Sequence, residues 1–221
     1  MTESPPELVF DLDGTLIDSV PDLHTCINSL LGSDGRRLLE LREVTRMVGD
    51  GVPALVRRAY EATGGVPGNL EDCIRRYLVL YGAALADKTV PYPGVVETLE
   101  LLRGAGHRMA VCTNKPYGPT MEILGALGLA QFFSAVAGGD SLPVRKPDAG
   151  HLLGLLEMLD SGPERAVMIG DSLNDIQVAI NAGVRSIAVS YGYRRQPVDE
   201  LGADIVVDSF SEIPAALARL S

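Results

Sequence analysis

Two aspartates stand two positions apart where a short apolar run near the start of the chain ends. The run covers residues 8–10, and Asp11, Asp13, Gly14 and Thr15 follow it. Side chains two residues apart on an extended segment point to the same side, so the two carboxylates lie close together. Like charges at this separation repel each other and need a cation. Gly14 allows a tight turn and leaves its backbone amide open to an anion.

A second pair of acids, Asp171 and Asp175, stands four positions apart at the start of a predicted helix over 173–182. Residues at this spacing share one face of a helix, so this pair can complete the same cation site. Carboxylate oxygens suit Mg²⁺, which also bridges to phosphate oxygens. The alternative is that the second pair only caps its helix and complements its dipole. The predicted metal-binding residues are Asp11, Asp13, Asp171 and Asp175.

A lysine, a threonine and an asparagine supply donors for an anion. Lys146 is a point charge suited to a phosphoryl group or to the carboxylate of a nucleophile. The Thr113 hydroxyl and the Asn114 amide can donate to phosphate oxygens. A metal and donors around a transferring phosphoryl group are what its transition state requires. Thr113 could instead only cap the next helix, and Lys146 could be a solvated surface lysine.

The chain from residue 93 onward alternates apolar runs with helical patterns. This alternation predicts an α/β fold with a doubly wound parallel sheet, a Rossmann-like core. In such sheets ligands bind beyond the carboxyl ends of the strands, where the polar residues named above lie. Predicted strands cover 8–10, 108–112, 134–137, 166–169, 185–189 and 205–207, and predicted helices cover 95–103, 117–128, 149–159, 173–182 and the stretch to about 220.

The segment between residues 18 and 92 has a different pattern. Helical periodicity dominates it, as in the apolar positions that follow Val52 at i+3, i+4 and i+7, and no strand is predicted. We expect residues 18–92 to form a small helical cap domain. This domain is inserted into a core that consists of residues 1–17 and 93–221.

Gly49, Asp50 and Gly51 stand between two helical patterns of this cap domain. They form either an interhelical turn only or a loop that faces the site. In the second case, the helix that follows would offer free amides to a substrate carboxylate. The predicted substrate- and phosphate-binding residues are Gly14, Thr15, Gly49, Asp50, Gly51, Thr113, Asn114 and Lys146.

Four motifs together resemble those of the haloacid dehalogenase superfamily, in the order of that family and over essentially the whole chain. The first is strong alone, the second and third are weak alone, and the set of four is specific. They are Asp11-Leu12-Asp13-Gly14-Thr15-Leu16-Ile17-Asp18-Ser19, Thr113-Asn114-Lys115, Lys146-Pro147-Asp148 and Gly170-Asp171-Ser172-Leu173-Asn174-Asp175.

The resemblance implies a role for each matching residue. Asp11 would attack phosphorus and form an aspartyl-phosphate. Asp13 would protonate the leaving oxygen and then deprotonate the water that releases phosphate. Thr113 and Lys146 would hold the phosphoryl group, and the cap domain would exclude water. The residues implied to bind Mg²⁺ are Asp11, the Asp13 backbone carbonyl and Asp171, with Asp175 either binding directly or supporting another ligand.

Within the superfamily, the sequence is similar to bacterial phosphoglycolate phosphatases. The similarity rests on residues 48–51, 138–143 and 190–193. It implies hydrolysis of 2-phosphoglycolate to glycolate and phosphate. A phosphatase for a sugar phosphate or a nucleoside monophosphate, a phosphomutase, and a phospho-receiver signalling module are the alternatives.

Some relatives are disfavoured by single residues. Dehalogenases lack an aspartate at the place of Asp13, because they have no leaving oxygen to protonate. Phosphonatases use a cap lysine, and residues 14–87 contain none. Hexose phosphomutases hold a second phosphate with a cap arginine, which residues 49–52 lack. Receivers lack both an acid two residues beyond the nucleophile and an insert of about 75 residues.

Charge and composition limit the partners. The net charge of −10 repels nucleic acids and anionic membrane surfaces. The three cysteines are far apart and odd in number, which disfavours a disulfide framework and fits a reducing cytoplasm. No signal peptide is visible in residues 1–7, and no apolar run is long enough to cross a membrane. We expect a cytoplasmic monomer or homodimer that acts on a small phosphorylated metabolite.

Overall fold

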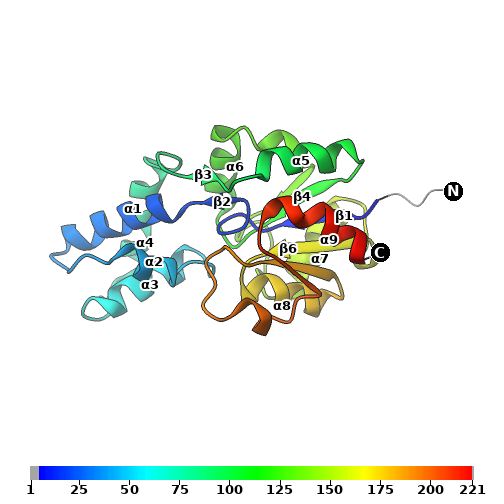
Figure 1. The fold of residues 1–221 in the computed structure, drawn as a ribbon. Helices are drawn as coiled ribbons and strands as arrows, with labels where there is room; N and C mark the ends of the chain where they lie inside the picture. The colour runs from blue at the N-terminus through cyan, green and yellow to red at the C-terminus, as the bar shows by residue number, and fades with distance from the viewer. Residues whose placement is uncertain (1–4, 221) are drawn as a thin grey trace.

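A parallel sheet forms the middle of the part of the molecule on the right in Figure 1. The computed structural model describes residues 5–220, so the ends of the predicted core and most of the stretch inspected for a signal peptide lie outside it. The sheet has the strand order β5-β4-β1-β6-β7-β8, and every described pairing in it is parallel. The strands are β1 (Glu7–Phe10), β4 (Met109–Cys112), β5 (Ala135–Ala137), β6 (Ala166–Gly170), β7 (Arg185–Val189) and β8 (Ile205–Val207).

Helices cover both faces of the sheet, as the alternating pattern predicts (Figure 1). Successive strand residues point to opposite faces. Leu8 and Phe10 pack in the cluster that includes α5, α6 and α9, and Val9 packs in the cluster that includes α7 and α8. These helices are α5 (Val95–Gly104), α6 (Tyr117–Ala126), α7 (Ala149–Met158), α8 (Leu173–Ala182) and α9 (Ile213–Leu220). The fold is therefore the predicted doubly wound α/β sheet.

Short 3₁₀ turns connect several of these elements. Gly183 ends α8 in the left-handed conformation with φ 68°, as a glycine at a helix end favours. The 3₁₀ turns are η1 (Ala130–Phe132), η2 (Pro163–Arg165), η3 (Val198–Glu200) and η4 (Phe210–Glu212).

Four helices lie together at the end of the molecule opposite both termini (Figure 1). We call them the helical lobe. Their apolar faces join one cluster that buries Tyr60 and Tyr77 completely. They are α1 (Val20–Ser33), α2 (Leu41–Thr45), α3 (Val52–Ala62) and α4 (Leu70–Gly82). None of the helices within residues 5–220 has the length and apolar composition needed to cross a membrane.

Two short antiparallel strands join the helical lobe to the sheet. They are β2 (Ile17–Asp18) and β3 (Val90–Pro91), with Ile17 opposite Pro91 and Asp18 opposite Val90. The sequence prediction of no strand between residues 18 and 92 is therefore wrong. Two residues are too few to produce a recognisable alternation, and Pro91 disfavours a strand.

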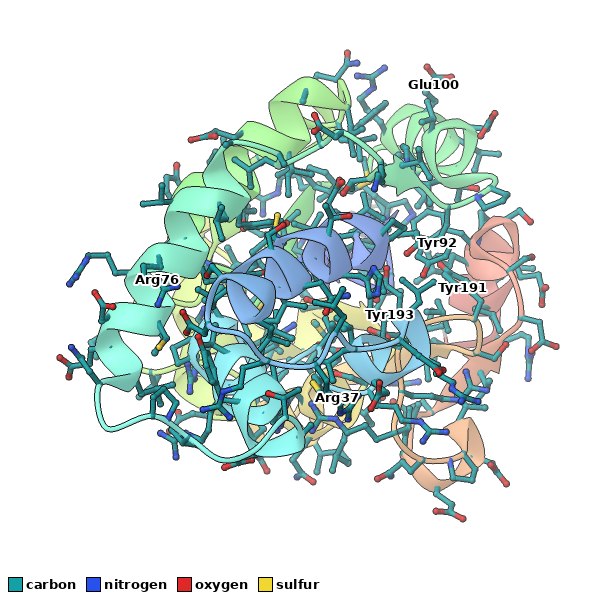
Figure 2. The ribbon with its side chains drawn as sticks, turned by 90° about the vertical axis from the view of Figure 1, so that its left-hand side faces the viewer. Arg37, Arg76, Tyr92, Glu100, Tyr191 and Tyr193 are labelled. Atoms are coloured by element: carbon teal, nitrogen blue, oxygen red, sulfur yellow. The ribbon has the colours of Figure 1, made fainter. Side chains whose placement is uncertain are left out.

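A tyrosine cluster holds this junction. Tyr92, Tyr191 and Tyr193 gather where the helical lobe meets the core (Figure 2). The Tyr193 hydroxyl accepts hydrogen bonds from the backbone amides of Ser19 (2.7 Å) and Val20 (3.2 Å), at the start of α1. The centres of the Tyr92 and Tyr191 rings lie 4.6 Å apart. The loop after β7 thereby fixes the position of α1.

Candidate active site

Three neighbouring strands place polar residues at one edge of the sheet. Asp11 follows β1, Thr113 follows β4 and Asp171 follows β6. Strand β1 lies between β4 and β6, where the strand order reverses. Ligands of doubly wound sheets bind at such a reversal, beyond the carboxyl ends of the strands. Lys146 reaches the same place from the loop between β5 and α7.

Lys146 and Asp11 form a buried ion pair. The Lys146 Nζ lies 2.8 Å from Asp11 Oδ1 and 2.5 Å from Asp175 Oδ1, and it donates to the Cys112 carbonyl at 2.6 Å. Burial lowers the pKa of Lys146, but the two carboxylates outweigh burial and raise it above its usual range. Burial and the charge of Asp175 raise the pKa of Asp11 to about 7, against the opposing effect of Lys146.

Asp11, Asp171 and Asp175 each place one carboxylate oxygen within 4.8 Å of the other two. All three are buried. Burial, followed by the charges of Asp175 and Asp11, raises the pKa of Asp171 well above its usual range. Three convergent carboxylates with too little positive charge fit a hard divalent cation such as Mg²⁺.

Asp175 also starts helix α8. Its Oδ2 accepts hydrogen bonds from the Ser172 amide (2.9 Å) and hydroxyl (2.7 Å). The Ser172 side chain accepts in turn from the Asp175 backbone amide, which completes a capping box. The Asp175 Oδ1 accepts from Lys146. Both readings of this residue in the sequence, a helix-capping acid and a member of the acidic cluster, therefore describe its position.

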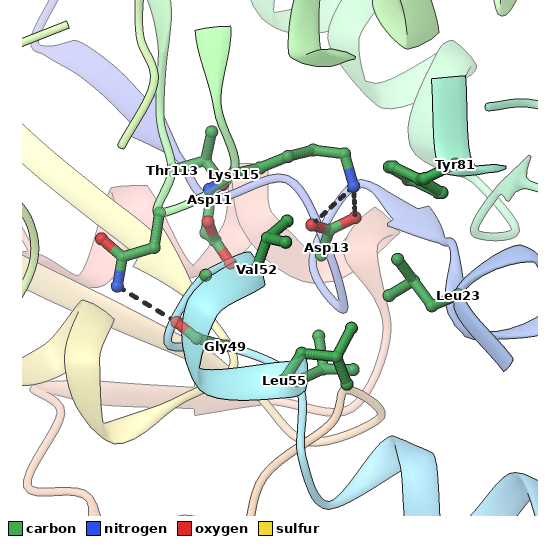
Figure 3. A pocket seen from close by; sticks show the side chains of 12 residues that line it. Asp11, Asp13, Leu23, Gly49, Val52, Leu55, Tyr81, Thr113 and Lys115 are labelled. Carbon is green, nitrogen blue, oxygen red and sulfur yellow. Dashed lines mark hydrogen bonds and ion pairs between the residues drawn. The ribbon is translucent and has the colours of Figure 1, made fainter. Parts of the chain in front are cut away.

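The Asp13 carboxylate has different partners from the acidic cluster. Both of its oxygens lie 3.1 Å from Lys115 Nζ, and its Oδ1 accepts from the Ser19 hydroxyl at 2.6 Å. Lys115 Nζ also lies 4.7 Å from the centre of the Tyr81 ring, which belongs to α4 of the helical lobe (Figure 3). Asp13 is thus held by groups on the side of the site toward the helical lobe.

A pocket of about 40 Å³ opens between the sheet edge and the helical lobe. Its sheet side is polar and its lobe side is largely apolar (Figure 3). The lining residues are Asp11, Asp13, Leu23, Val48, Gly49, Gly51, Val52, Leu55, Tyr81, Thr113, Asn114 and Lys115.

Gly14 and Thr15 lie against the acidic cluster and are not among the described lining residues. The Thr15 hydroxyl donates to Asp171 Oδ1 at 3.3 Å. Gly14 has φ +92°, and a Cβ there would overlap the Asp171 carboxylate. These two residues therefore shape the acidic cluster through their contacts with Asp171.

Thr113 and Asn114 face the pocket with spare hydrogen-bonding capacity. The Thr113 hydroxyl accepts from the Lys115 amide at 3.2 Å, so its proton is available to a ligand. The Asn114 amide donates to the Gly49 and Lys146 carbonyls, both at 3.1 Å. Its buried Oδ1 has no hydrogen-bond partner among residues 5–220.

The loop of residues 49–51 is fastened to the core. Gly49 and Gly51 line the pocket. The Asp50 carboxylate pairs with Arg58 of the helical lobe. It also accepts hydrogen bonds from the core residues Arg195 and Asn174, each at 2.6 Å. Burial alone would raise the pKa of Asp50, but hydrogen bonds from Asn174, Arg195 and Arg58 lower it to about 2.

Several residues of the site were missed by sequence analysis. Lys115 stands in the second motif, but nothing in the residue types or spacing of that motif predicts that its side chain turns toward Asp13. His151 is buried, its Nδ1 accepts from the Lys146 amide (3.2 Å) and its Nε2 donates to the Gly138 carbonyl (3.0 Å). Arg195 and Tyr193 contact residues some 150 positions away or more, which no local pattern reveals.

Known proteins are similar to this chain in sequence and in fold. The family model of haloacid dehalogenase-like hydrolases matches residues 8–189. A phosphoglycolate phosphatase of Caulobacter vibrioides is 42% identical over 216 residues, which cover 96% of this chain and 91% of that protein.

Two solved structures are similar along nearly the whole chain. The crystal structure of a predicted phosphoglycolate phosphatase from Haemophilus somnus has a TM-score of 0.92 and 32% identity, and covers 98% of this chain and 99% of its own. That of CbbY from Rhodobacter sphaeroides, in complex with phosphate, has a TM-score of 0.80 and 27% identity, and covers 97% and 99%. The four motifs, the sheet and these matches agree, and the chain belongs to the family of haloacid dehalogenase-like hydrolases.

Proposed function

We propose that this protein is a phosphoric monoester hydrolase that converts 2-phosphoglycolate to glycolate and phosphate, with Asp11 as its covalent nucleophile. The observation that carries the proposal is the place of Asp11. It stands at the reversal of strand order, paired with Lys146 at 2.8 Å, and it borders a small pocket with Asp13 on the opposite side toward the helical lobe. The names of the relatives favour phosphoglycolate among phosphate esters.

In the first step, a carboxylate oxygen of Asp11 attacks phosphorus and the bond from phosphorus to the ester oxygen breaks. Asp13 gives its proton to the departing alcohol oxygen. Lys146 holds the Asp11 carboxylate in place, and the Thr113 hydroxyl donates to a phosphoryl oxygen. The charge that moves onto the phosphoryl oxygens is thus met by groups that are already in position.

In the second step, water attacks the phosphorus of the aspartyl-phosphate. Asp13 takes a proton from this water, and the bond between phosphorus and the Asp11 oxygen breaks. Phosphate leaves, and Asp11 returns to its starting state. Asp13 acts as acid and then as base, so its freedom from the acidic cluster suits both steps.

Mg²⁺ would be held by Asp11, Asp171 and the Asp13 backbone carbonyl, with Asp175 beside them. When bound, it neutralises the phosphoryl oxygens and screens the attacking carboxylate from the anionic substrate. The raised pKa values of Asp11 and Asp171 support a cation at this place, because each records uncompensated negative charge in a buried setting.

The helical lobe serves as the cap of this site in our proposal, with residues 18–92 inserted between two parts of the core. Leu23, Val48, Val52 and Leu55 supply the apolar side of the pocket, which would keep bulk water from the aspartyl-phosphate. The enzyme's place in the cytoplasm remains a prediction, supported by three buried cysteines that form no disulfide among the described residues. We propose that it is a monomer or a homodimer.

The test is phosphate release over a panel of small esters, with and without Mg²⁺, ranked by kcat/KM. We expect 2-phosphoglycolate to lead sugar phosphates and nucleoside monophosphates by about tenfold or more, and EDTA to abolish release. If phosphate is released from all esters at similar rates, 2-phosphoglycolate is not the specific substrate. If no ester releases phosphate, the protein is not a phosphate monoester hydrolase.

A further inference from the structure

A single positive charge borders the proposed substrate pocket. Among the described residues that line it, Lys115 is the one with a cationic side chain, and Asp11 and Asp13 are the acidic ones. Lys146 is buried behind Asp11 and is occupied by two carboxylates and a carbonyl. The chain contains only three lysines. An anionic group of a substrate that enters this pocket beyond Asp11 would therefore meet Lys115.

Lys115 is buried beside one carboxylate and one aromatic ring. Its side chain is 4% exposed, and it meets the Asp13 carboxylate and the face of the Tyr81 ring. A buried ammonium needs strong partners to remain charged, and a second anion beside it is favourable. Asp13 keeps the Ser19 hydroxyl as a donor at 2.6 Å if Lys115 turns to another acceptor.

The position of Lys115 matches the alcohol portion of a substrate rather than its phosphoryl group. Lys146 contacts Asp11, which attacks phosphorus, whereas Lys115 contacts Asp13, which protonates the oxygen on the far side of that phosphorus. A group attached to the departing oxygen thus extends toward Lys115 and the helical lobe (Figure 3). Tyr81 lies there with a buried hydroxyl that has no hydrogen-bond partner in the described part of the chain.

We infer that Lys115 and Tyr81 form a subsite for an acidic group on the leaving alcohol, and that this subsite selects carboxylated phosphate esters. The inference rests on the proposed function and adds its specificity determinants. The Lys115 ammonium pairs with the carboxylate of the substrate, and the Tyr81 hydroxyl donates to it. An ester without this carboxylate leaves Lys115 on Asp13, the group that must give a proton to the leaving oxygen.

The test compares two esters of similar size, 2-phosphoglycolate and 2-hydroxyethyl phosphate, which carry a carboxylate and a neutral hydroxymethyl group. In Lys115→Met, the ratio of their kcat/KM values should fall by about 30-fold or more, because a buried charge pair is lost for one ester only. Lys115→Arg keeps a positive charge and should retain part of the preference. Lys88→Met, which removes an exposed lysine outside the pocket, should leave the ratio unchanged.

The two esters separate this inference from its alternatives. If Lys115→Met slows both esters by the same factor, Lys115 only positions Asp13 and the subsite is rejected. If the unsubstituted enzyme hydrolyses both esters equally, the subsite and the proposed substrate are both rejected, while the hydrolase reaction stands. If Lys115→Met does not fold, Tyr81→Phe decides: an intact subsite predicts about a fivefold fall in the ratio, and no fall rejects the role of Tyr81.

Discussion

The Lys146 ammonium balances two buried carboxylates at once, those of Asp11 and Asp175, with side-chain exposures of 1%, 10% and 1%. Removing one partner of a buried ion pair leaves uncompensated charge and costs about 3–5 kcal/mol. Lys146→Met should therefore lower the free energy of unfolding by about this amount in urea titrations without metal. Lys88→Met is the control, since its side chain is exposed. Equal stability of the two variants would show that the pair contributes nothing.

Asp11→Asn should abolish turnover, by roughly 10⁴-fold or more, because an amide cannot serve as the nucleophile. It should also change how the stability of the metal-free protein depends on pH. The pKa of Asp11 in the folded protein is raised to about 7 from 3.8. Its protonated form therefore stabilises the folded state fully below pH 4, and this stabilisation is lost as the pH rises to 7. The asparagine variant does not titrate here, so its stability does not fall for this reason.

Melting temperatures between pH 4 and 8 in EDTA check this expectation. The melting temperature of Asp11→Asn should rise relative to that of the unsubstituted protein as the pH rises. A difference in melting temperature that stays constant over this range would contradict the raised pKa of Asp11. Phosphate release, measured with Mg²⁺ on the same samples, tests the nucleophile separately from the titration.

The acids of the site could be predicted from the sequence, and most of their partners could not. Asp11, Asp171 and Lys146 follow strand ends, and the order of parallel strands brings such ends together whatever the side-chain details. Lys115 and Tyr81 meet because the last turn of α4 reaches the pocket at the edge of the sheet. That contact depends on tertiary packing, which leaves no periodic signal in either segment.

At the scale of elements, the loop after β7 is pressed against the acidic cluster. A Cβ on Gly192 would overlap the Asp171 side chain and the Gly14 carbonyl. Gly192→Ala should displace the Asp171 carboxylate and weaken Mg²⁺ binding by about 10–100-fold, as loss of a supporting contact does at other metal sites. Calorimetric titration with Mg²⁺ measures this change.

Gly118→Ala is the matched control, because nothing lies within 4 Å of a Cβ at that position in α6. Replacing a helical glycine should raise stability by about 0.5–1 kcal/mol and leave Mg²⁺ affinity unchanged. If both alanine variants bind Mg²⁺ like the unsubstituted protein, the close approach of the loop has no role in metal binding.

The strands and helices of the core could be predicted because each apolar run ends at a polar or glycine-containing turn. Residues 166–169 illustrate this, since the strand ends where Gly170 and Asp171 begin the next motif. The strands β2 and β3 could not be predicted, because two residues give no alternation and their pairing joins positions some 70 residues apart. Only the folded chain brings them together.

At the scale of the whole molecule, Arg195 ties the helical lobe to the core. It donates to the Arg46 and Val48 carbonyls, both at 2.8 Å, and to Asp50 at 2.6 Å. Its side chain is 42% exposed, so solvent screening reduces the value of this contact to ~1 kcal/mol. Arg195→Met should favour separation of the lobe from the core and raise KM about fivefold, with a smaller change in kcat.

Steady-state kinetics on 2-phosphoglycolate checks the Arg195 prediction. Arg194→Met is the control, since it changes the neighbouring arginine of the same loop and leaves these three contacts in place. The KM of the control should stay near that of the unsubstituted enzyme. A shared rise in both variants would point to the charge of the loop rather than to the contacts of Arg195.

The β2–β3 ribbon brings both ends of the helical lobe to one point, because Ile17 lies opposite Pro91 and Asp18 opposite Val90. Chain can be inserted between two neighbouring positions without changing the elements on either side. Any segment inserted between these two strands would therefore begin and end beside the loop that carries Asp11 and Asp13. A chimera that carries the corresponding segment of another hydrolase of this family should keep the reaction of the core. It should take its preference for the alcohol portion of the ester from the hydrolase that donated the segment.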